Sequence, residues 1–187
     1  MARLLERIRP IAIPQKPSTF ESIARSIVYQ QLSGRAAETI WQRLVARFDD
    51  GEFEAETVLR KRPSTLRKAG LSAAKTESLR DLARHVRSGE LQPARLGELD
   101  DAAVIEELTR VKGIGPWSAH MHLIFALARP DVWPTGDLGV RKGLQRFFAL
   151  DEVPTAKEAE VLGAPYRPWR TLLAWSMWRI HDVEAWS

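Results

Sequence analysis

The sequence predicts an all-α protein, and three observations support this. Apolar residues recur at spacings of three and four along most of the chain, as on one face of a helix. No alternating apolar and polar run is long enough to build a sheet. Proline, glycine and capping residues interrupt the pattern at ordinary loop spacings, which gives about ten short helices.

A chain of 187 residues can form one sizeable domain or two small helical lobes that share a core. We expect residues 1–187 to form a single compact helical domain with two lobes. In it, the N-terminal segment packs with the C-terminal helices. We also expect no additional N-terminal β domain in a chain of this length.

The first half of the chain is punctuated by capping and turn residues. A capping box at 18–21 begins a helix that ends at Gln30 and Gln31, and a turn at 33–34 precedes a second helix. These two helices bury faces that carry Phe20, Ile23, Ala24 and Ile27 in the first, and Ala37, Ile40, Trp41, Leu44 and Phe48 in the second. Short elements follow near 55–60 and 63–69, where Pro63 marks a start and Gly70 an end. A longer helix is expected over 75–88.

The second half begins with two helices, near 101–111 and 116–128, around the stretch VKGIGPWSAH at 111–120. Asp100 or Asp101 is the expected N-cap of the first, and Pro116 the first residue of the second. Further helices are expected at 137–148, at 155–163 after a capping box from Thr155 to Glu158, and from Pro168 to about Asp182.

Charge and cysteine content limit the possible functions. The chain has no cysteine, which excludes disulfides, thiolate zinc sites and cysteine-ligated iron–sulphur clusters, and fits a reducing interior. Its net charge is +4, and its pI is about 9.7. Such a charge suits nucleic acid, although an arginine-rich composition spread over solvated faces would give the same value. The start, MARLLERIRP, lacks an apolar stretch of signal-peptide length, and the apolar run 123–128 is too short to span a bilayer.

The stretch at 111–120 contains two glycines directly before a helix N-terminus. Gly113 and Gly115 let another molecule approach the backbone closely, and the free amides and dipole of the helix attract anions. Lys112 adds a positive charge beside them. These features predict a phosphate site, whereas a tight turn that only reverses the chain between two helices is the alternative.

The longer string L-x-x-V-x-G-I-G-x-W-S-A, residues 108–119, resembles the helix-hairpin-helix of DNA repair glycosylases, whose hairpin amides hold one DNA phosphate. The segment VWPTGDLGVRKGLQRF at 132–147 resembles the part of that superfamily that carries its catalytic aspartate. FESIARSIVYQQLSGRAAETI at 20–40 resembles its N-terminal helix pair, and YRPWRTLLAWSMWR at 166–179 resembles the closing helix of its 3-methyladenine DNA glycosylase II branch. The resemblance to this HhH-GPD superfamily covers roughly residues 18–182 in the expected order.

The resemblance implies a monofunctional glycosylase of base excision repair that removes alkylated, 3-methyladenine-type bases after flipping them out of the duplex. Asp137 would be its catalytic carboxylate, although an aspartate after Thr-Gly is also a common N-cap, and the two roles are compatible. Trp117 stands where bifunctional members carry a nucleophilic lysine, so Schiff-base chemistry is not expected.

The resemblance also implies a base pocket formed by Trp117, Met121 and Trp178. Trp178 lies away from the apolar stripe of the final helix, so it needs another packing surface or a pocket. That stripe carries Trp169, Leu172, Leu173, Ser176 and Ile180. Met121 and Gly139 replace bulkier residues of the best-known branch, which leaves the base preference open.

Gln31 or Leu32 would act as the wedge that fills the space left by the flipped base. The alternative is an ordinary helix end, with Ser33 capping the next helix. No cofactor is expected beyond a Na⁺ or K⁺ ion at the carbonyls of Thr109, Val111 and Gly113. His120 and His122 are two residues apart and cannot share one helix face, so they do not predict a zinc site.

The expected partner is double-stranded DNA with damaged bases, bound by a monomer in the cytoplasm, at a bacterial nucleoid, or in another compartment that contains DNA. Two alternatives stay open. One is a helix-hairpin-helix module that binds DNA without catalysis, and Asp137 argues against it because a pure binder needs no carboxylate near phosphates. The other is a glycosylase for deaminated or mismatched bases, whose neutral leaving groups would require additional hydrogen-bond donors.

Overall fold

The computed structural model describes residues 1–8, 12–32, 34–49 and 52–183, and every regular element in these ranges is helical. The all-α prediction is therefore confirmed. The chain divides into two compact units. We call residues 16–122 the hairpin unit, and residues 1–15 together with 123–187 the aspartate unit. Among the described residues, no helix has both the length and the apolar character needed to cross a membrane.

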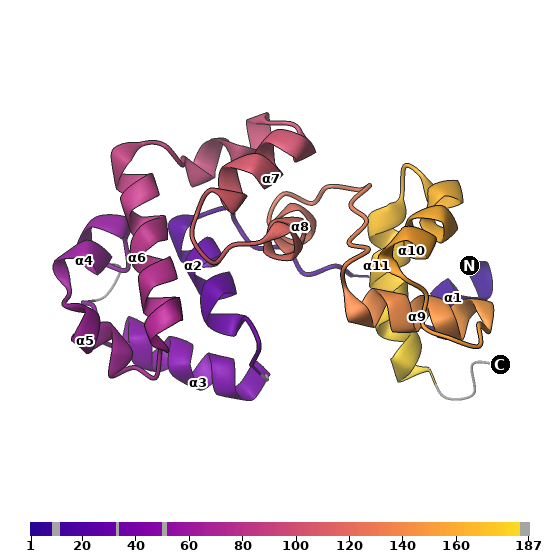
Figure 1. The fold of residues 1–187 in the computed structure, drawn as a ribbon, viewed down its shortest axis with the longest axis horizontal. Helices are drawn as coiled ribbons and strands as arrows, with labels where there is room; N and C mark the ends of the chain where they lie inside the picture. The colour runs from indigo at the N-terminus through magenta and orange to yellow at the C-terminus, as the bar shows by residue number, and fades with distance from the viewer. Residues whose placement is uncertain (9–11, 33, 50–51, 184–187) are drawn as a thin grey trace. The chain divides into compact units, whose positions relative to one another are not determined.

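The hairpin unit is arranged around its longest helix, α6, which packs against α2, α4 and α5 (Figure 1). Leucines from several of its helices are fully buried, among them Leu44, Leu66, Leu79, Leu82 and Leu108. Its helices are α2 (Phe20–Tyr29), α3 (Gly34–Val45), α4 (Ala55–Arg60), α5 (Pro63–Arg67), α6 (Ala73–Ser88) and α7 (Asp101–Thr109), with a 3₁₀ turn at Pro93–Glu98. Most of α8 (Pro116–Phe125) also belongs to this unit.

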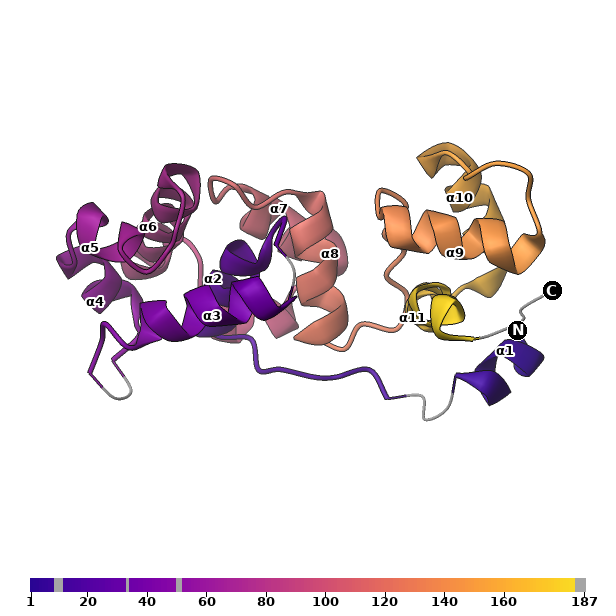
Figure 2. The same cartoon turned by 90° about the horizontal axis from the view of Figure 1, so that it is seen from below.

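The aspartate unit has α9 packed against α10 and α11 (Figure 2). Gly143 of α9 makes the closest approach, since a Cβ there would lie 2.3 Å from the carbonyl oxygen of Met177. Leu4 and Ile8 belong to the same core as Leu144, Leu173 and Met177. The helices are α1 (Ala2–Arg7), α9 (Leu138–Phe148), α10 (Ala156–Gly163) and α11 (Arg170–Arg179), with 3₁₀ turns at Ala164–Tyr166 and Ile180–Asp182.

Several predicted helix ends are confirmed. Pro63 is the first residue of α5, and Gly70 follows that helix with a φ of +108°. Asp100 caps α7, and the capping box from Thr155 to Glu158 precedes α10. Each of these signals is local: it fixes φ or supplies a hydrogen bond to the first turn, so the sequence alone locates it.

Other boundaries were wrong. The box predicted at 18–21 lies one residue later: Thr19 Oγ1 accepts the Ser22 amide at 3.1 Å, and Ser22 Oγ accepts the Thr19 amide at 3.0 Å. The helix predicted over 75–88 begins at Ala73, because Ser72 caps it. The helix predicted to reach residue 128 ends at Phe125, and Ala128 has a φ of +53°.

The final helix begins at Arg170 rather than Pro168. Trp169 is its N-cap residue and is 63% exposed, so it does not belong to the buried stripe that was predicted for it. Arg170 is buried instead. Its guanidinium donates to Asp131 from Nε at 2.7 Å and from Nη2 at 2.8 Å, and this bidentate pairing allows a cation in the interior. Neither the pairing nor the shifted start has a signal in the local sequence.

Candidate functional site

Asp137 is the N-cap of α9, and its side chain is held by two donors. Oδ1 accepts the backbone amide of Val140 at 2.8 Å and the indole Nε1–H of Trp178 at 2.9 Å. The N-cap interpretation is therefore confirmed, and it fixes the carboxylate by contacts from two helices, α9 and α11. A carboxylate held in one orientation is what electrostatic stabilisation of a cationic transition state requires.

Trp178 is half-buried in an aromatic cluster of the aspartate unit. It stacks on Phe125 with ring centroids 6.0 Å apart and meets Trp175 edge-on at 6.5 Å. Gly139 leaves the space for its contact with Asp137, because a Cβ at 139 would lie 3.0 Å from Asp137 Oδ1 and 3.0 Å from Trp178 Cδ1. Trp178 was predicted to need a packing surface apart from the apolar stripe of its helix. The aromatic cluster and Asp137 supply that surface.

The hairpin between α7 and α8 is anchored to α6. The backbone amide of Lys112 donates to Asp81 Oδ2 at 2.8 Å. Gly113 has a φ of +82°, and a Cβ there would lie 2.2 Å from Ser78 Oγ. Inside the hairpin, the Ile114 amide donates to the Val111 carbonyl at 3.0 Å. Sequence reasoning missed both α6 anchors, which resemble ordinary polar residues of a solvated helix face.

The hairpin keeps two backbone donors available. Within the described part of the chain, the amides of Gly113 and Gly115 have no hydrogen-bond partner. A Cβ at Gly115 would meet no atom within 4 Å, so this backbone is open to an approaching group. The Lys112 amide is occupied, and only its exposed side chain could reach a phosphate. Binding of phosphate at these three residues stays a prediction that this geometry allows.

The predicted wedge residues lie in the same unit as the hairpin, at the end of α2. Gln31 is exposed and has a φ of +56°, and the Leu32 side chain next to it is 39% exposed. The Gln30 amide nitrogen donates to the Gly113 carbonyl at 2.9 Å and to Ser118 Oγ at 3.1 Å. The Gln30 side chain thus links the end of α2 to the hairpin and to the start of α8. Ser33, the other capping candidate, lies outside the described residues.

Trp117 and Met121 are on α8 in the hairpin unit, with Trp117 46% exposed and Met121 half-buried. Asp137 and Trp178 belong to the aspartate unit, so the shared base pocket stays a prediction. The cation at the carbonyls of 109, 111 and 113 also stays a prediction. Two of these carbonyls, at 111 and 113, already accept one hydrogen bond each, from the Ile114 amide and the Gln30 side chain.

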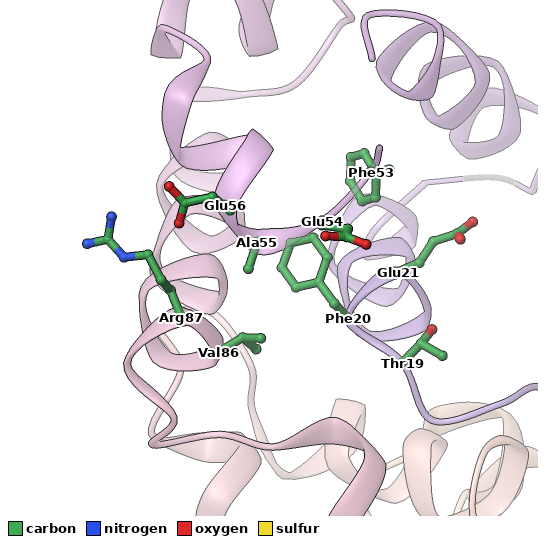
Figure 3. A pocket seen from close by; sticks show the side chains of 9 residues that line it. All are labelled: Thr19, Phe20, Glu21, Phe53, Glu54, Ala55, Glu56, Val86 and Arg87. Atoms are coloured by element: carbon green, nitrogen blue, oxygen red, sulfur yellow. The ribbon is translucent and has the colours of Figure 1, made fainter. Parts of the chain in front are cut away.

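A hollow of about 530 Å³ lies at the other end of α2, between the first residues of α2 and α4 and the last turns of α6 (Figure 3). Two phenylalanines and three carboxylates line most of it, with one arginine: Phe20, Phe53, Glu21, Glu54, Glu56 and Arg87. The ten residues of α2 separate this hollow from Gln30 by about 15 Å. Its acidic lining is unsuitable for a phosphate backbone, so we do not assign DNA to it.

His122 is the last residue of the hairpin unit. Burial lowers the pKa of its imidazole to about 4, so the ring is neutral at physiological pH. His122 Nε2 lies 3.0 Å from Ser18 Oγ, which itself donates to the Pro93 carbonyl at 2.6 Å. His122 is therefore a satisfied interior group with a structural role.

Comparison with known proteins adds a family match. The family model described as "HhH-GPD superfamily base excision DNA repair protein" matches residues 24–167. DNA-3-methyladenine glycosylase 1 of Schizosaccharomyces pombe is 33% identical over 185 residues, which span 96% of this chain and 79% of the relative.

Solved structures agree with that match. The S. pombe 3-methyladenine DNA glycosylase Mag1, in complex with abasic DNA, superposes with a TM-score of 0.87 at 31% identity, covering 100% of this chain and 92% of Mag1. A DNA-3-methyladenine glycosidase from Bacillus halodurans gives a TM-score of 0.83 at 34% identity, over 95% of this chain and 83% of its own.

Proposed function

The chain belongs to the HhH-GPD superfamily of base excision DNA repair proteins, and on that premise we propose that it is a monofunctional DNA glycosylase for alkylated bases. Its substrate would be a 3-methyladenine-type base in double-stranded DNA, flipped out of the helix before excision. The relatives named as DNA-3-methyladenine glycosylases support this substrate class.

The observation that carries the proposal is the fixed carboxylate of Asp137, held by the Val140 amide and the Trp178 indole. As the C1′–N bond breaks, its electron pair leaves with the base and the sugar becomes cationic. Asp137 stabilises that charge and orients a water molecule. The water oxygen bonds to C1′, and its released proton passes to the carboxylate or to solvent.

One carboxylate is sufficient for an alkylated purine. The methylated base already carries a positive charge, so it departs as a neutral molecule without a strong general acid. Trp117 supplies no amine at the position of the nucleophilic lysine in bifunctional members, so no Schiff base forms there and the strand is not cut. The product is free base and an intact strand with an abasic site.

The decisive experiment measures release of free base from methylated duplex DNA by the wild type and by Asp137→Asn. Asparagine keeps an oxygen that can accept from Val140 and Trp178, so this variant removes the charge while retaining the cap. Asp100→Asn is the matched control, because Asp100 Oδ1 caps α7 through the Ala103 amide at 2.8 Å. We expect release of 3-methyladenine by the wild type and the control, and a loss of at least about 100-fold in Asp137→Asn.

Two results would contradict the proposal. Equal release by Asp137→Asn and wild type would remove Asp137 from catalysis. No release by any variant, with binding to abasic-site DNA intact, would favour a binding module. Duplexes containing uracil, hypoxanthine or a mismatch, assayed in parallel, test the other alternative.

Two finer points belong to the same proposal. The protein would act as a monomer, which sedimentation of its DNA complex tests. A Na⁺ or K⁺ ion would bind the carbonyls of Thr109, Val111 and Gly113, each of which has a lone pair to offer. Unequal affinity for abasic-site DNA in Na⁺, K⁺ and tetramethylammonium at equal ionic strength would support the ion, and equal affinity would contradict it.

A further inference from the structure

Lys75 occupies an unusual position for a lysine. It is the third residue of α6, where its backbone amide donates to the N-cap Ser72 at 3.1 Å. Helix N-termini favour acidic side chains, and the first turn of α6 contains none. Burial also lowers the pKa of the Lys75 ammonium group. Both effects disfavour a charged lysine here, so a compensating interaction must retain it.

That interaction is with the end of a different helix. Lys75 Nζ donates to the carbonyls of Val28 and Gln30, both at 2.7 Å. The last carbonyls of α2 lack partners within the helix, and a cation at a helix C-terminus is favourable. The Tyr29 carbonyl between them accepts the Leu32 amide at 3.4 Å. Three consecutive carbonyls are therefore satisfied, two of them by Lys75.

The chain bends sharply directly after these carbonyls. Gln30 leaves the helix with a ψ of 133°, and Gln31 adopts a φ of +56°, which is uncommon for a residue with a side chain. The surrounding structure must hold such a conformation. The side chains of Gln31 and Leu32 therefore follow directly after a backbone that Lys75 holds at Val28 and Gln30.

The same loop is tied to the hairpin. The Gln30 side chain donates to the Gly113 carbonyl and to Ser118 Oγ. Lys75 therefore holds the backbone of Gln30, while the Gln30 side chain contacts the hairpin at Gly113 and the first turn of α8 at Ser118. Every contact in this set lies within the hairpin unit.

We propose that Lys75 and Gln30 are positioning residues that lock the wedge loop, residues 30–32, to the hairpin that would bind a DNA phosphate, so that contact with the DNA backbone and insertion into the base stack occur as one rigid unit. This inference rests on the proposed function, because it assumes that Gln31 or Leu32 enters the duplex. Neither positioning residue touches the reacting bond. Each acts through the loop that it holds.

The test is a double-mutant cycle on kcat/KM for base release from duplex DNA. Lys75→Met removes both contacts to α2, and Lys68→Met is the control for the same change at an exposed lysine of this unit. The second background, Gln31→Gly with Leu32→Ala, lacks both wedge side chains. We expect Lys75→Met to reduce kcat/KM about 10-fold in the wild type and less than about 2-fold in the wedge-free background. Lys75→Arg, which keeps donors, should recover most of the rate.

An equal loss in both backgrounds would overturn the proposal, because Lys75 would then act through general stability. No loss in either background would overturn it too. If Lys75→Met does not fold, Gln30→Ala answers the same question, since it removes only the two contacts to the hairpin. It should show the same dependence on the wedge side chains.

A second readout separates this inference from the proposed function. Amide hydrogen exchange in a peptide covering residues 29–32 should become at least about 10-fold faster in Lys75→Met and stay unchanged in Lys68→Met. This result does not require catalysis. Unchanged exchange would overturn the positioning role, whereas absence of base release by the wild type would overturn only the assigned function.

Discussion

Gly139→Ala should separate activity from stability. A Cβ at this position would lie 3.0 Å from both Asp137 Oδ1 and Trp178 Cδ1, and 3.3 Å from Trp178 Nε1. Ordinary contacts start near 3.4 Å, so the carboxylate or the indole must move by a few tenths of an ångström. The 2.9 Å bond between Trp178 and Asp137 is the contact directly affected.

The expected loss of reaction rate follows from the strength of the hydrogen bond between Trp178 and Asp137. A hydrogen bond to a charged group contributes about 1.5–3 kcal/mol, and partial loss corresponds to about 1–2 kcal/mol. If the bond fixes the carboxylate for catalysis, the single-turnover rate of base release should fall about 5- to 30-fold. Alanine is favoured over glycine in a helix by up to about 1 kcal/mol, which offsets part of the lost hydrogen-bond energy, so the Tm should fall by no more than a few degrees.

The assay is single-turnover base release from methylated duplex DNA, with thermal unfolding measured on the same samples. Gly136→Ala is the matched control, because a Cβ at Gly136 meets nothing within 4 Å. Trp178→Phe removes the same donor, so combining it with Gly139→Ala should reduce the rate little further. A wild-type rate in Gly139→Ala would refute the reasoning, as would a loss of rate that only follows a loss of stability.

Three further predictions address the core, the hairpin and pH. Gly143→Ala should destabilise by about 2–3 kcal/mol in urea titrations, because its Cβ would overlap Met177. Gly115→Ala should keep its Tm but weaken binding to abasic-site DNA about 10-fold in anisotropy titrations, and unchanged affinity would contradict close approach of a phosphate. His122, whose folded pKa is about 4 against 6.5 unfolded, should make stability fall by about 3 kcal/mol as the pH drops from 6.5 to 4. His122→Gln should flatten that dependence, and the same slope in both proteins would contradict it.

The elements that sequence analysis found correctly share one property: their signals are local. Asp100, Pro63 and Thr155 each act on the turn that follows them, through a cap or a fixed φ. Asp137 belongs to this group, which is why its capping role was predictable from the residues alone. The catalytic role that we propose for Asp137 rests on the resemblance, because no local pattern distinguishes a capping carboxylate from a reactive one.

The errors arose where distant residues decide the structure. Helix α1 was not predicted because the segment MARLLERIRP has no long apolar stretch, and only the core of the aspartate unit explains the burial of Leu4 and Ile8. The periodicity places Trp169 on the apolar stripe of the final helix. In the structure Arg170 binds Asp131, which lies 39 residues earlier in the chain, and α11 begins only after Trp169. Periodicity describes one helix at a time and contains no information about such partners.

Helix α6 is the clearest example of this limit. Lys75, Ser78 and Asp81 follow one another at spacings of three, so they form a stripe along the helix. Lys75 donates to carbonyls at the end of α2, and Ser78 packs directly against Gly113. Asp81 accepts a hydrogen bond from the Lys112 amide. In the sequence these residues have the polar character of a solvated helix face, and in the structure they contact both the end of α2 and the hairpin. A substitution on this stripe should therefore change DNA handling even though none of its residues belongs to a recognisable DNA-binding motif.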